Sequence, residues 1–322
     1  MTKPKTPRDD VYTRVTNRII ADLENGVRPW QRPWDASNAG EGIALPLRAS
    51  GAPYKGINVM LLWGAAADKG FKSVIWMTYK QAAALGAQVR KGESGSLVVY
   101  ANSLTKTETD DAGEEVEKQI PFMKGYTVFN IEQIDGLPAH YYAKPVQPLE
   151  PVARIEHAEA FFAGTGAVIK HGGAKAFYSP VLDHVQMPPR ESFRDPESYC
   201  SVLAHELTHW TSHPARLARE LGKRFGDRAY AAEELIAEMG AAFLCADLGI
   251  AADVRPDHAA YLASWLEVLK ADSRAIFTAA SQAMPAPGSP SPCGLPGQRT
   301  EASTSCCYGV LPPTRAIPAR SG

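Results

Sequence analysis

The stretch Ser201–His213, SVLAHELTHWTSH, carries three histidines and one glutamate on what we expect to be a single helix. Its segment HELTH fits the pattern His-Glu-x-x-His. Residues four apart in a helix lie on the same face, so His205 and His209 can direct their imidazoles at one metal ion. Glu206 is placed to hold a water beside that ion. The stretch therefore predicts a metal site that does chemistry.

The expected chemistry is metal-assisted hydrolysis. A bound metal lowers the pKa of a water molecule, and Glu206 can take its proton, which makes a nucleophile for an amide carbonyl. The helix has a clear start, with Asp195 as its N-cap and Pro196 in its first position, and we expect it over residues 196–213. A chance match of the motif on a solvated helix is the alternative interpretation.

A catalytic zinc site needs a third protein ligand and one open position. His213 is one candidate, four residues beyond His209. It is also more than about 10 Å along the helix axis from His205, at 1.5 Å per residue. Pro214 ends the helix there, so we favour a ligand from elsewhere.

The preferred source is a second helix expected over residues 231–248. Its segment EELIAE puts Glu234 and Glu238 four apart on one face, beside small residues such as Gly240. Small residues let two helices approach closely, which a shared ion requires. We expect one of the two carboxylates to bind the ion and the other to hydrogen-bond a ligating histidine.

Composition sets the outer limits. The chain has 322 residues, 45% of them hydrophobic and 21% charged, with a formal net charge of −1. This is ordinary for a soluble globular protein of about two domains. We find no signal peptide and no apolar run long enough for a membrane helix. The five cysteines make no spaced framework, and Cys200 and Cys245 lie in apolar helical patterns, so we expect a cytoplasmic protein.

The proline-rich segment at 143–151 is the best domain boundary. It predicts one domain over residues 8–145 and a second over 152–283, where a helical pattern runs from 258 to 283. Residues 284–322 are rich in proline and glycine without any helical or strand period, and we expect a disordered tail. This tail is either native or the product of a displaced reading frame.

The first domain has a basic surface. Residues 101–119 read as a polar, acidic connection of a long hairpin, and outside them residues 1–145 hold 16 basic against 10 acidic side chains. Basic residues alternate with aromatic ones, a pattern typical of proteins that bind single-stranded nucleic acid through phosphates and stacked bases. The candidate DNA contacts are Trp30, Arg32, Trp34, Tyr54, Lys55, Asn58, Arg90, Lys91 and Lys124. The alternative is that the tryptophans fill the core or anchor one domain to the other.

The motifs HELTH and EELIA resemble those of zincin metallopeptidases of the Glu-ligand type. The resemblance implies that Glu234 is the third ligand and that Glu238 occupies the acidic place behind a histidine. It also implies a divalent ion, zinc or another such as manganese or cobalt, and a short edge strand near residues 183–188 beside the cleft.

A wider resemblance covers roughly residues 8 to 283. The segments GVRPWQRPW, YKGINVMLLW, WMTYKQAAALGAQVRKGESG, HELTHWTSHPARL and EELIAEMGAAFLCADLGI follow one another in this order. The order is similar to ArdC-type antirestriction proteins and to the N-terminal part of TraC-type conjugative primases. It implies single-stranded DNA binding, a metallopeptidase-like domain and the protection of incoming plasmid DNA from restriction.

We therefore expect an α+β protein: a small curved sheet with helices in the first domain, and a compact zincin with a short sheet over the active-site helix in the second. Three functions are compatible with it. The first is an antirestriction protein whose metal domain either acts on a protein near the DNA, such as a host restriction factor, or serves only as a scaffold. The second is an intracellular zinc metalloprotease without a DNA role. The third is a binding module whose metal is structural.

Overall fold

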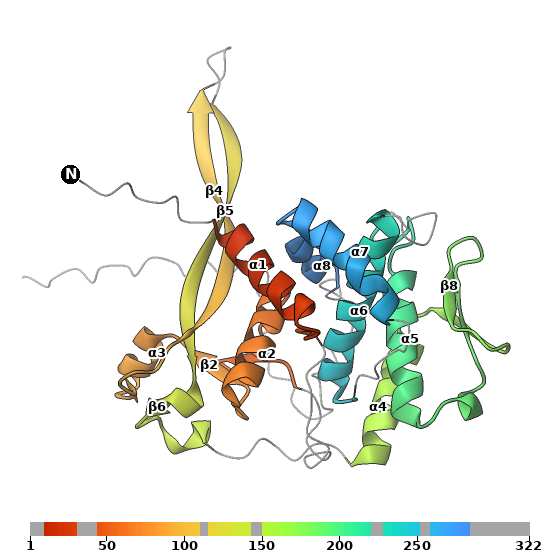
Figure 1. Ribbon diagram of the computed structural model, residues 1–322, viewed down its shortest axis with the longest axis horizontal. Helices are drawn as coiled ribbons and strands as arrows, with labels where there is room; N and C mark the ends of the chain where they lie inside the picture. Colours follow the sequence, from red (N-terminus) through yellow and green to blue (C-terminus); the bar gives the residue numbers. More distant parts are fainter. Residues whose placement is uncertain are drawn as a thin grey trace, which may run out of the picture. The chain divides into compact units, whose positions relative to one another are not determined.

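The computed structural model describes residues 10–30, 44–109, 115–142, 150–219, 228–251 and 258–283. All of them belong to one compact unit. The fold is α+β, as expected, with long curved strands on one side of the packed helices and a small group of strands on the other (Figure 1). The α-helices are α1 (Val11–Glu24), α2 (Ile57–Lys69), α3 (Tyr79–Ala84), α4 (Pro151–Gly164), α5 (Pro196–Trp210), α6 (Arg228–Leu248), α7 (His258–Ala271) and α8 (Ala275–Gln282). The short 3-10 helices are η2 (Ile131–Gln133), η3 (Ala139–Tyr141) and η4 (Arg190–Ser192).

Two sheets lie in the N-terminal part. Four strands follow the order β1-β2-β5-β4, in which only the β1–β2 pair is parallel. A second, two-stranded sheet pairs β3 with β6. The strands are β1 (Leu47–Arg48), β2 (Ile75–Met77), β3 (Gln88–Val89), β4 (Ser96–Thr109), β5 (Glu115–Asn130) and β6 (Ile134–Asp135).

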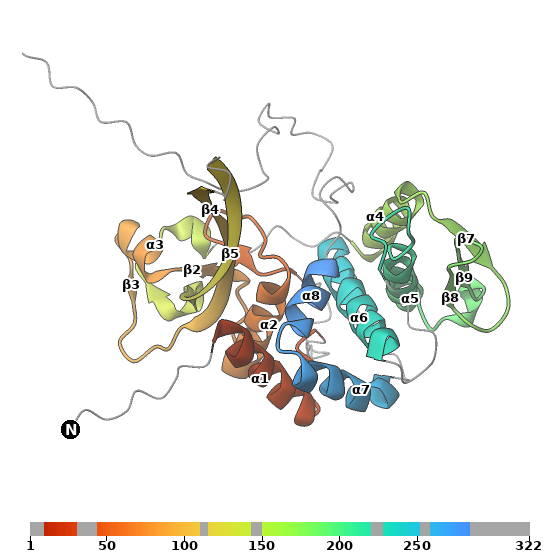
Figure 2. The same cartoon turned by 90° about the horizontal axis from the view of Figure 1, so that it is seen from above.

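β4 and β5 form a long, strongly curved hairpin (Figures 1 and 2). They pair from Ser96 with Val128 out to Thr109 with Glu115. The expectation of a polar connection over residues 101–119 is therefore wrong for most of that segment. Its β-branched residues favour extended pairing, and strands of this kind tolerate polar side chains where a face is open to solvent.

The C-terminal part holds a three-stranded sheet of order β7-β9-β8, with β7 (Val168–His171), β8 (Phe177–Ser179) and β9 (His184–Met187). β9 is the middle strand, parallel to β7 and antiparallel to β8. The expectation of an edge strand at 183–188 is wrong in this respect. β9 is nearly all buried, as a strand paired on both sides should be.

α5 begins as its sequence predicts. The Asp195 carboxylate accepts a hydrogen bond from the Ser198 amide at 2.7 Å, and Pro196 is the first helical residue. The helix ends at Trp210, three residues before the expected end, because a turn replaces it. There the Thr211 hydroxyl donates to the Thr208 carbonyl at 2.6 Å. The pattern over 258–283 is likewise two helices, since Asp272 caps the Arg274 amide between α7 and α8.

Helix α6 lies between two hydrophobic cores. One face belongs to a core shared with α1, α2, α7, α8 and the four-stranded sheet, around Trp76, Phe243 and Trp265. Its other side packs with α4, α5 and the three-stranded sheet, around Leu203 and Met187.

The first core joins residues from both sides of the expected boundary at 143–151, most of which lies outside the described residues. The division into domains at 145 and 152 stays a prediction, as does the tail 284–322, which lies outside the described residues too.

The two described cysteines lie in the core. Cys200 and Cys245 are buried, and burial raises the pKa of each thiol to about 12, as expected for inert core cysteines. Within the described part of the chain, none of the helices has the length and apolarity to cross a bilayer.

Candidate functional site

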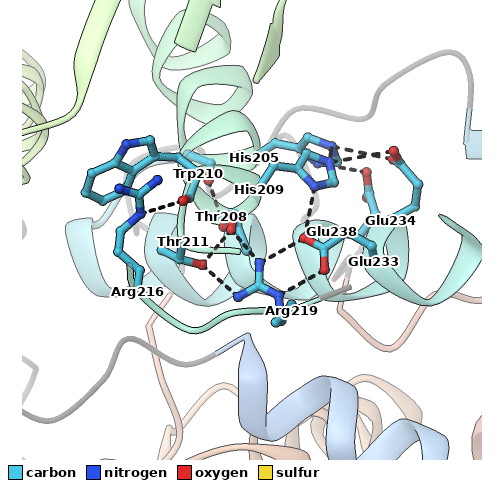
Figure 3. Close-up of polar contacts among 11 residues, drawn as sticks. His205, Thr208, His209, Trp210, Thr211, Arg216, Arg219, Glu233, Glu234 and Glu238 are labelled. Atoms are coloured by element: carbon cyan, nitrogen blue, oxygen red, sulfur yellow. Dashed lines mark hydrogen bonds and ion pairs between the residues drawn. The ribbon is translucent and has the colours of Figure 1, made fainter. Parts of the chain in front are cut away.

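Three side chains from two helices converge at the HELTH segment. His205 and His209 come from α5 and Glu234 from α6 (Figure 3). The two Nε2 atoms lie 3.1 Å apart, and each is 3.6 Å from an oxygen of the Glu234 carboxylate. Ligands held tetrahedrally at about 2.1 Å from one ion would lie about 3.4 Å apart. The spacing therefore fits a metal site made of these three residues.

The opposite nitrogen of each imidazole faces a second carboxylate. His209 Nδ1 lies 3.2 Å from Glu233 Oε1, and His205 Nδ1 lies 3.3 Å from Glu238 Oε1. An imidazole that donates from Nδ1 keeps the lone pair of Nε2 for a metal. The sequence left open which of Glu234 and Glu238 lies behind a histidine. In the structure that residue is Glu238, behind His205.

Glu233 was not among the expected site residues, and neither was its partner Arg219. The Arg219 guanidinium donates to both Glu233 oxygens, at 2.8 and 2.9 Å. It also donates to the Thr208 carbonyl at 2.7 Å and to the Thr211 hydroxyl at 2.8 Å (Figure 3). Arg219 therefore ties the end of α5 to the carboxylate that orients His209. The adjacent pair Glu233-Glu234 was the sequence signal that could have indicated Glu233, because neighbouring residues of one helix can both contact a pair of histidines.

The site concentrates negative charge in the interior. The side chains of Glu206, Glu233, Glu234 and Glu238 are all buried. Burial raises the pKa of Glu233 and Glu234, but hydrogen bonds from Arg219, His209 and His205 outweigh it and hold both below the ordinary value. Ionised carboxylates in a low-dielectric interior favour a nearby cation, which a divalent ion would provide.

His205 responds to the same field. Burial lowers its pKa, yet the nearby carboxylates of Glu234, Glu238 and Glu206 raise it to about 9. A metal ion therefore has to compete with a proton for His205. Glu206 itself is only 3% exposed and sits within electrostatic reach of His205, as the motif requires.

His213 does not join the group. Its Nδ1 accepts a hydrogen bond from the Ala215 amide at 3.2 Å, in the turn after α5. The geometry favours Glu234 over His213 as the third ligand.

Close contact between α5 and α6 is what brings the ligands together. A Cβ atom on Gly240 would lie 2.5 Å from Thr208 Cγ2 and 2.6 Å from Thr208 Oγ1. Any larger residue at 240 would separate the helices, so the glycine keeps Glu234 within reach of the histidines.

The candidate DNA contacts separate into several groups. Trp30 is 2% exposed and packs edge-on against Trp265 at 5.6 Å, so it fills the core, as the alternative interpretation had it. Tyr54 is buried as well. Asn58 bonds the Val99 amide and carbonyl, at 2.8 and 2.9 Å, and so satisfies the free edge of β4.

The charged candidates lie on the surface. Lys55, Lys91 and Lys124 are exposed, while Arg90 is exposed and paired with Glu93 and Asp135. Arg32 and Trp34 lie outside the described residues. The structure thus leaves the lysines available to a ligand and removes the ring faces of Trp30 and Tyr54.

Comparison with known proteins identifies both halves of the chain. Residues 9–129 match the N-terminal domain of the anti-restriction factor ArdC, and residues 156–282 match a zincin-like metallopeptidase. The sequence and fold define a zincin-like domain joined to the N-terminal domain of an antirestriction factor. The chain belongs to the ArdC family of antirestriction proteins.

Solved structures and sequence relatives agree with this assignment. The metal-free crystal structure of ArdC from plasmid R388 is 46% identical, with a TM-score of 0.71, over 85% of this chain and 94% of that one. The Mn(II)-bound form is 44% identical, with a TM-score of 0.69 and the same coverage. An uncharacterized protein of Sinorhizobium fredii, y4eC, is 46% identical over 88% of this chain and 92% of its own length.

A further relative is much longer than this chain. DNA primase TraC of Escherichia coli is 40% identical over 84% of this chain, but the match spans only 26% of the primase. Together, the zincin-like domain and the Mn(II)-bound relative support a divalent metal in this family.

Proposed function

We propose that the protein binds single-stranded DNA, protects incoming plasmid DNA from restriction, and carries a divalent-metal site that hydrolyses peptide bonds. His205, His209 and Glu234 hold the ion in this proposal, with Zn²⁺ as the first candidate and Mn²⁺ as the second. The cytoplasm is where such DNA meets restriction enzymes, so we place the protein there.

One observation carries the metal part of the proposal. Two imidazole nitrogens lie 3.1 Å apart, each lies 3.6 Å from a different oxygen of the Glu234 carboxylate, and a further carboxylate lies behind each ring. A divalent ion bound there would lower the pKa of water and polarise an amide carbonyl.

The surrounding residues have separate tasks. Glu206 accepts a proton from the attacking water and passes it to the leaving amine. Glu233 and Glu238 orient His209 and His205, and Arg219 holds Glu233 in place. These contacts fix the ring positions before any ligand arrives, which lowers the cost of ordering the site.

The DNA part rests on the family and on surface chemistry. Antirestriction is the property named in the ArdC relatives, and a primase shares 40% identity with the chain. Exposed lysines of the N-terminal part supply the phosphate contacts that any strand needs. The protein substrate would be a factor close to that DNA, such as a host restriction component.

The experiment is a plasmid-transfer assay into a restricting host, with wild type and Glu206→Gln compared. Glu206→Gln keeps the shape of the site and the metal ligands but removes the base. Loss of protection, with metal content unchanged, would mean that hydrolysis is part of the function. Full protection by the variant would separate protection from proteolysis and leave DNA binding as the active property. No protection by wild type would contradict the antirestriction proposal.

A metalloprotease without a DNA role is the second candidate. The burial of Trp30 and Tyr54 favours it, because two of the expected stacking residues cannot reach a base. Wild-type protein that cleaves peptides but does not bind single strands at low salt would select this candidate.

A further inference from the structure

One face of the β4–β5 hairpin carries aromatic and cationic side chains together. In an antiparallel pair, directly opposed residues point to the same face, and so do residues two apart on one strand. Tyr100 is opposed to Lys124, and Asn102 is opposed to Phe122. Tyr126 is two residues from Lys124. We call Tyr100, Asn102, Phe122, Lys124 and Tyr126 the hairpin face.

Four members of the hairpin face contact one another. The rings of Tyr100 and Phe122 meet edge to face at 6.3 Å. The Lys124 ammonium lies 5.6 Å from the centre of the Phe122 ring, and the Asn102 amide donates to the Tyr100 hydroxyl at 2.7 Å. Tyr100 is 44% exposed and Tyr126 37%, which is high for large aromatic rings. These contacts hold the rings of Tyr100 and Phe122 in place, with Tyr100 exposed and Phe122 partly exposed.

A second cation lies close to the same surface. The exposed Arg48 guanidinium stacks over the Tyr54 ring at 5.4 Å. Burial raises the pKa of both Tyr54 and Tyr126, and the positive charge of the nearby Arg48 partly offsets that rise in each. The buried Tyr54 ring therefore packs beneath the guanidinium of the exposed Arg48. Arg48 and Lys124 thus both place positive charge near Tyr126.

We propose that the hairpin face, with Arg48, is where unpaired nucleotides of single-stranded DNA bind. Tyr100, Phe122 and Tyr126 offer surfaces on which bases stack, and Lys124 and Arg48 contact the phosphates. Duplex DNA cannot bind in this way, because its bases already stack on one another. This inference rests on the proposed DNA-binding function and replaces Trp30, Tyr54 and Asn58 as the direct contacts.

The test is a fluorescence-anisotropy titration of the full chain with a labelled single-stranded oligonucleotide at two salt concentrations. Tyr100→Ala with Phe122→Ala should weaken binding about tenfold or more. Lys124→Ala should reduce the magnitude of the salt slope by about 0.7. The matched controls are Phe177→Ala, an exposed ring on β8, and Lys170→Ala, an exposed lysine on β7, both of which should bind as wild type does.

Two further measurements guard against a misfolded hairpin. Tyr100→Phe keeps the ring and should bind within about twofold of wild type. Photocrosslinking of unaltered protein to an oligonucleotide with 5-iodouracil should attach the label to peptides of β4 or β5. Attachment only to other peptides would overturn the inference.

The outcomes separate this inference from the proposed function. If wild type binds single strands and the hairpin-face variants bind equally well, the inference is wrong and the DNA-binding function stands. If wild type does not bind single strands, both are wrong. If the variants change self-association while DNA affinity stays the same, the face is a protein interface and the inference is overturned.

Discussion

At the residue scale, the proposed metal centre follows from spacing that is visible in the sequence. His205 and His209 are four apart on a helix, and the helix that carries Glu234 has small residues where the two must meet. Arg219 could not be predicted because it lies outside both α5 and α6, so that no helical periodicity relates it to Glu233. A long-range ion pair of this kind depends on how the chain turns after α5.

The same residues predict a pH dependence of metal binding. Protonated His205 cannot bind an ion, and its pKa in the metal-free protein is about 9, above the ordinary value of 6.5. The apparent affinity should therefore rise by up to tenfold per pH unit as the pH increases toward 9, and level off above it. Isothermal titration calorimetry in buffers of different ionisation enthalpy should detect about one proton released per ion at pH 7.5. No proton release at that pH would show that His205 is neutral.

At the element scale, helix existence was easier to predict than helix length. The capping residues Asp195 and Pro196 fixed the start of α5, but its end depends on a turn built by Thr211 and Arg219. The hairpin strands were underestimated because acidic and threonine-rich segments look like loops when their partner strand is not known. The burial of Trp30 against α7 could not be predicted either, because its contact with Trp265 joins segments far apart in the sequence.

The close approach of α5 and α6 gives the element-scale prediction. Gly240→Ala should lower the free energy of unfolding by about 1–3 kcal/mol, because the new methyl meets Thr208, and it should weaken metal binding. The double variant with Thr208→Ala should recover part of both losses, as coupled neighbours do. Urea denaturation and metal titration measure the two effects.

Gly64 in the middle of α2 is the matched control. A Cβ there would meet nothing within 4 Å, so Gly64→Ala should stabilise the protein by about 0.5–1 kcal/mol through helix propensity. Equal effects at 240 and 64 would mean that the α5–α6 contact is not tight.

At the scale of the whole molecule, one core joins residues on both sides of the segment 143–151. Trp30 meets Trp265 at 5.6 Å, Trp265 stacks on Tyr261, and the Tyr261 hydroxyl lies 3.2 Å from that of Tyr230. Tyr230 in turn hydrogen-bonds Glu234. The proline-rich segment predicts a boundary, and the packing of α1 and α2 with α7 and α8 could not be predicted from it.

This shared core predicts cooperative unfolding. Calorimetry of the full chain should show one unfolding transition. Trp30→Ala should lower the free energy of unfolding by about 3–5 kcal/mol, as large aromatic truncations in cores do. Two separate transitions, with only one shifted by Trp30→Ala, would instead mean that the halves fold independently.

The central claim is that Glu234 completes the metal site, and metal stoichiometry tests it most directly. Native mass spectrometry of the purified full chain, after exposure to Zn²⁺ or Mn²⁺ and desalting, counts the bound ions in wild type, Glu234→Gln and His213→Gln. We predict one ion in wild type and in His213→Gln, and none in Glu234→Gln. An ion retained by Glu234→Gln and lost from His213→Gln would contradict the account.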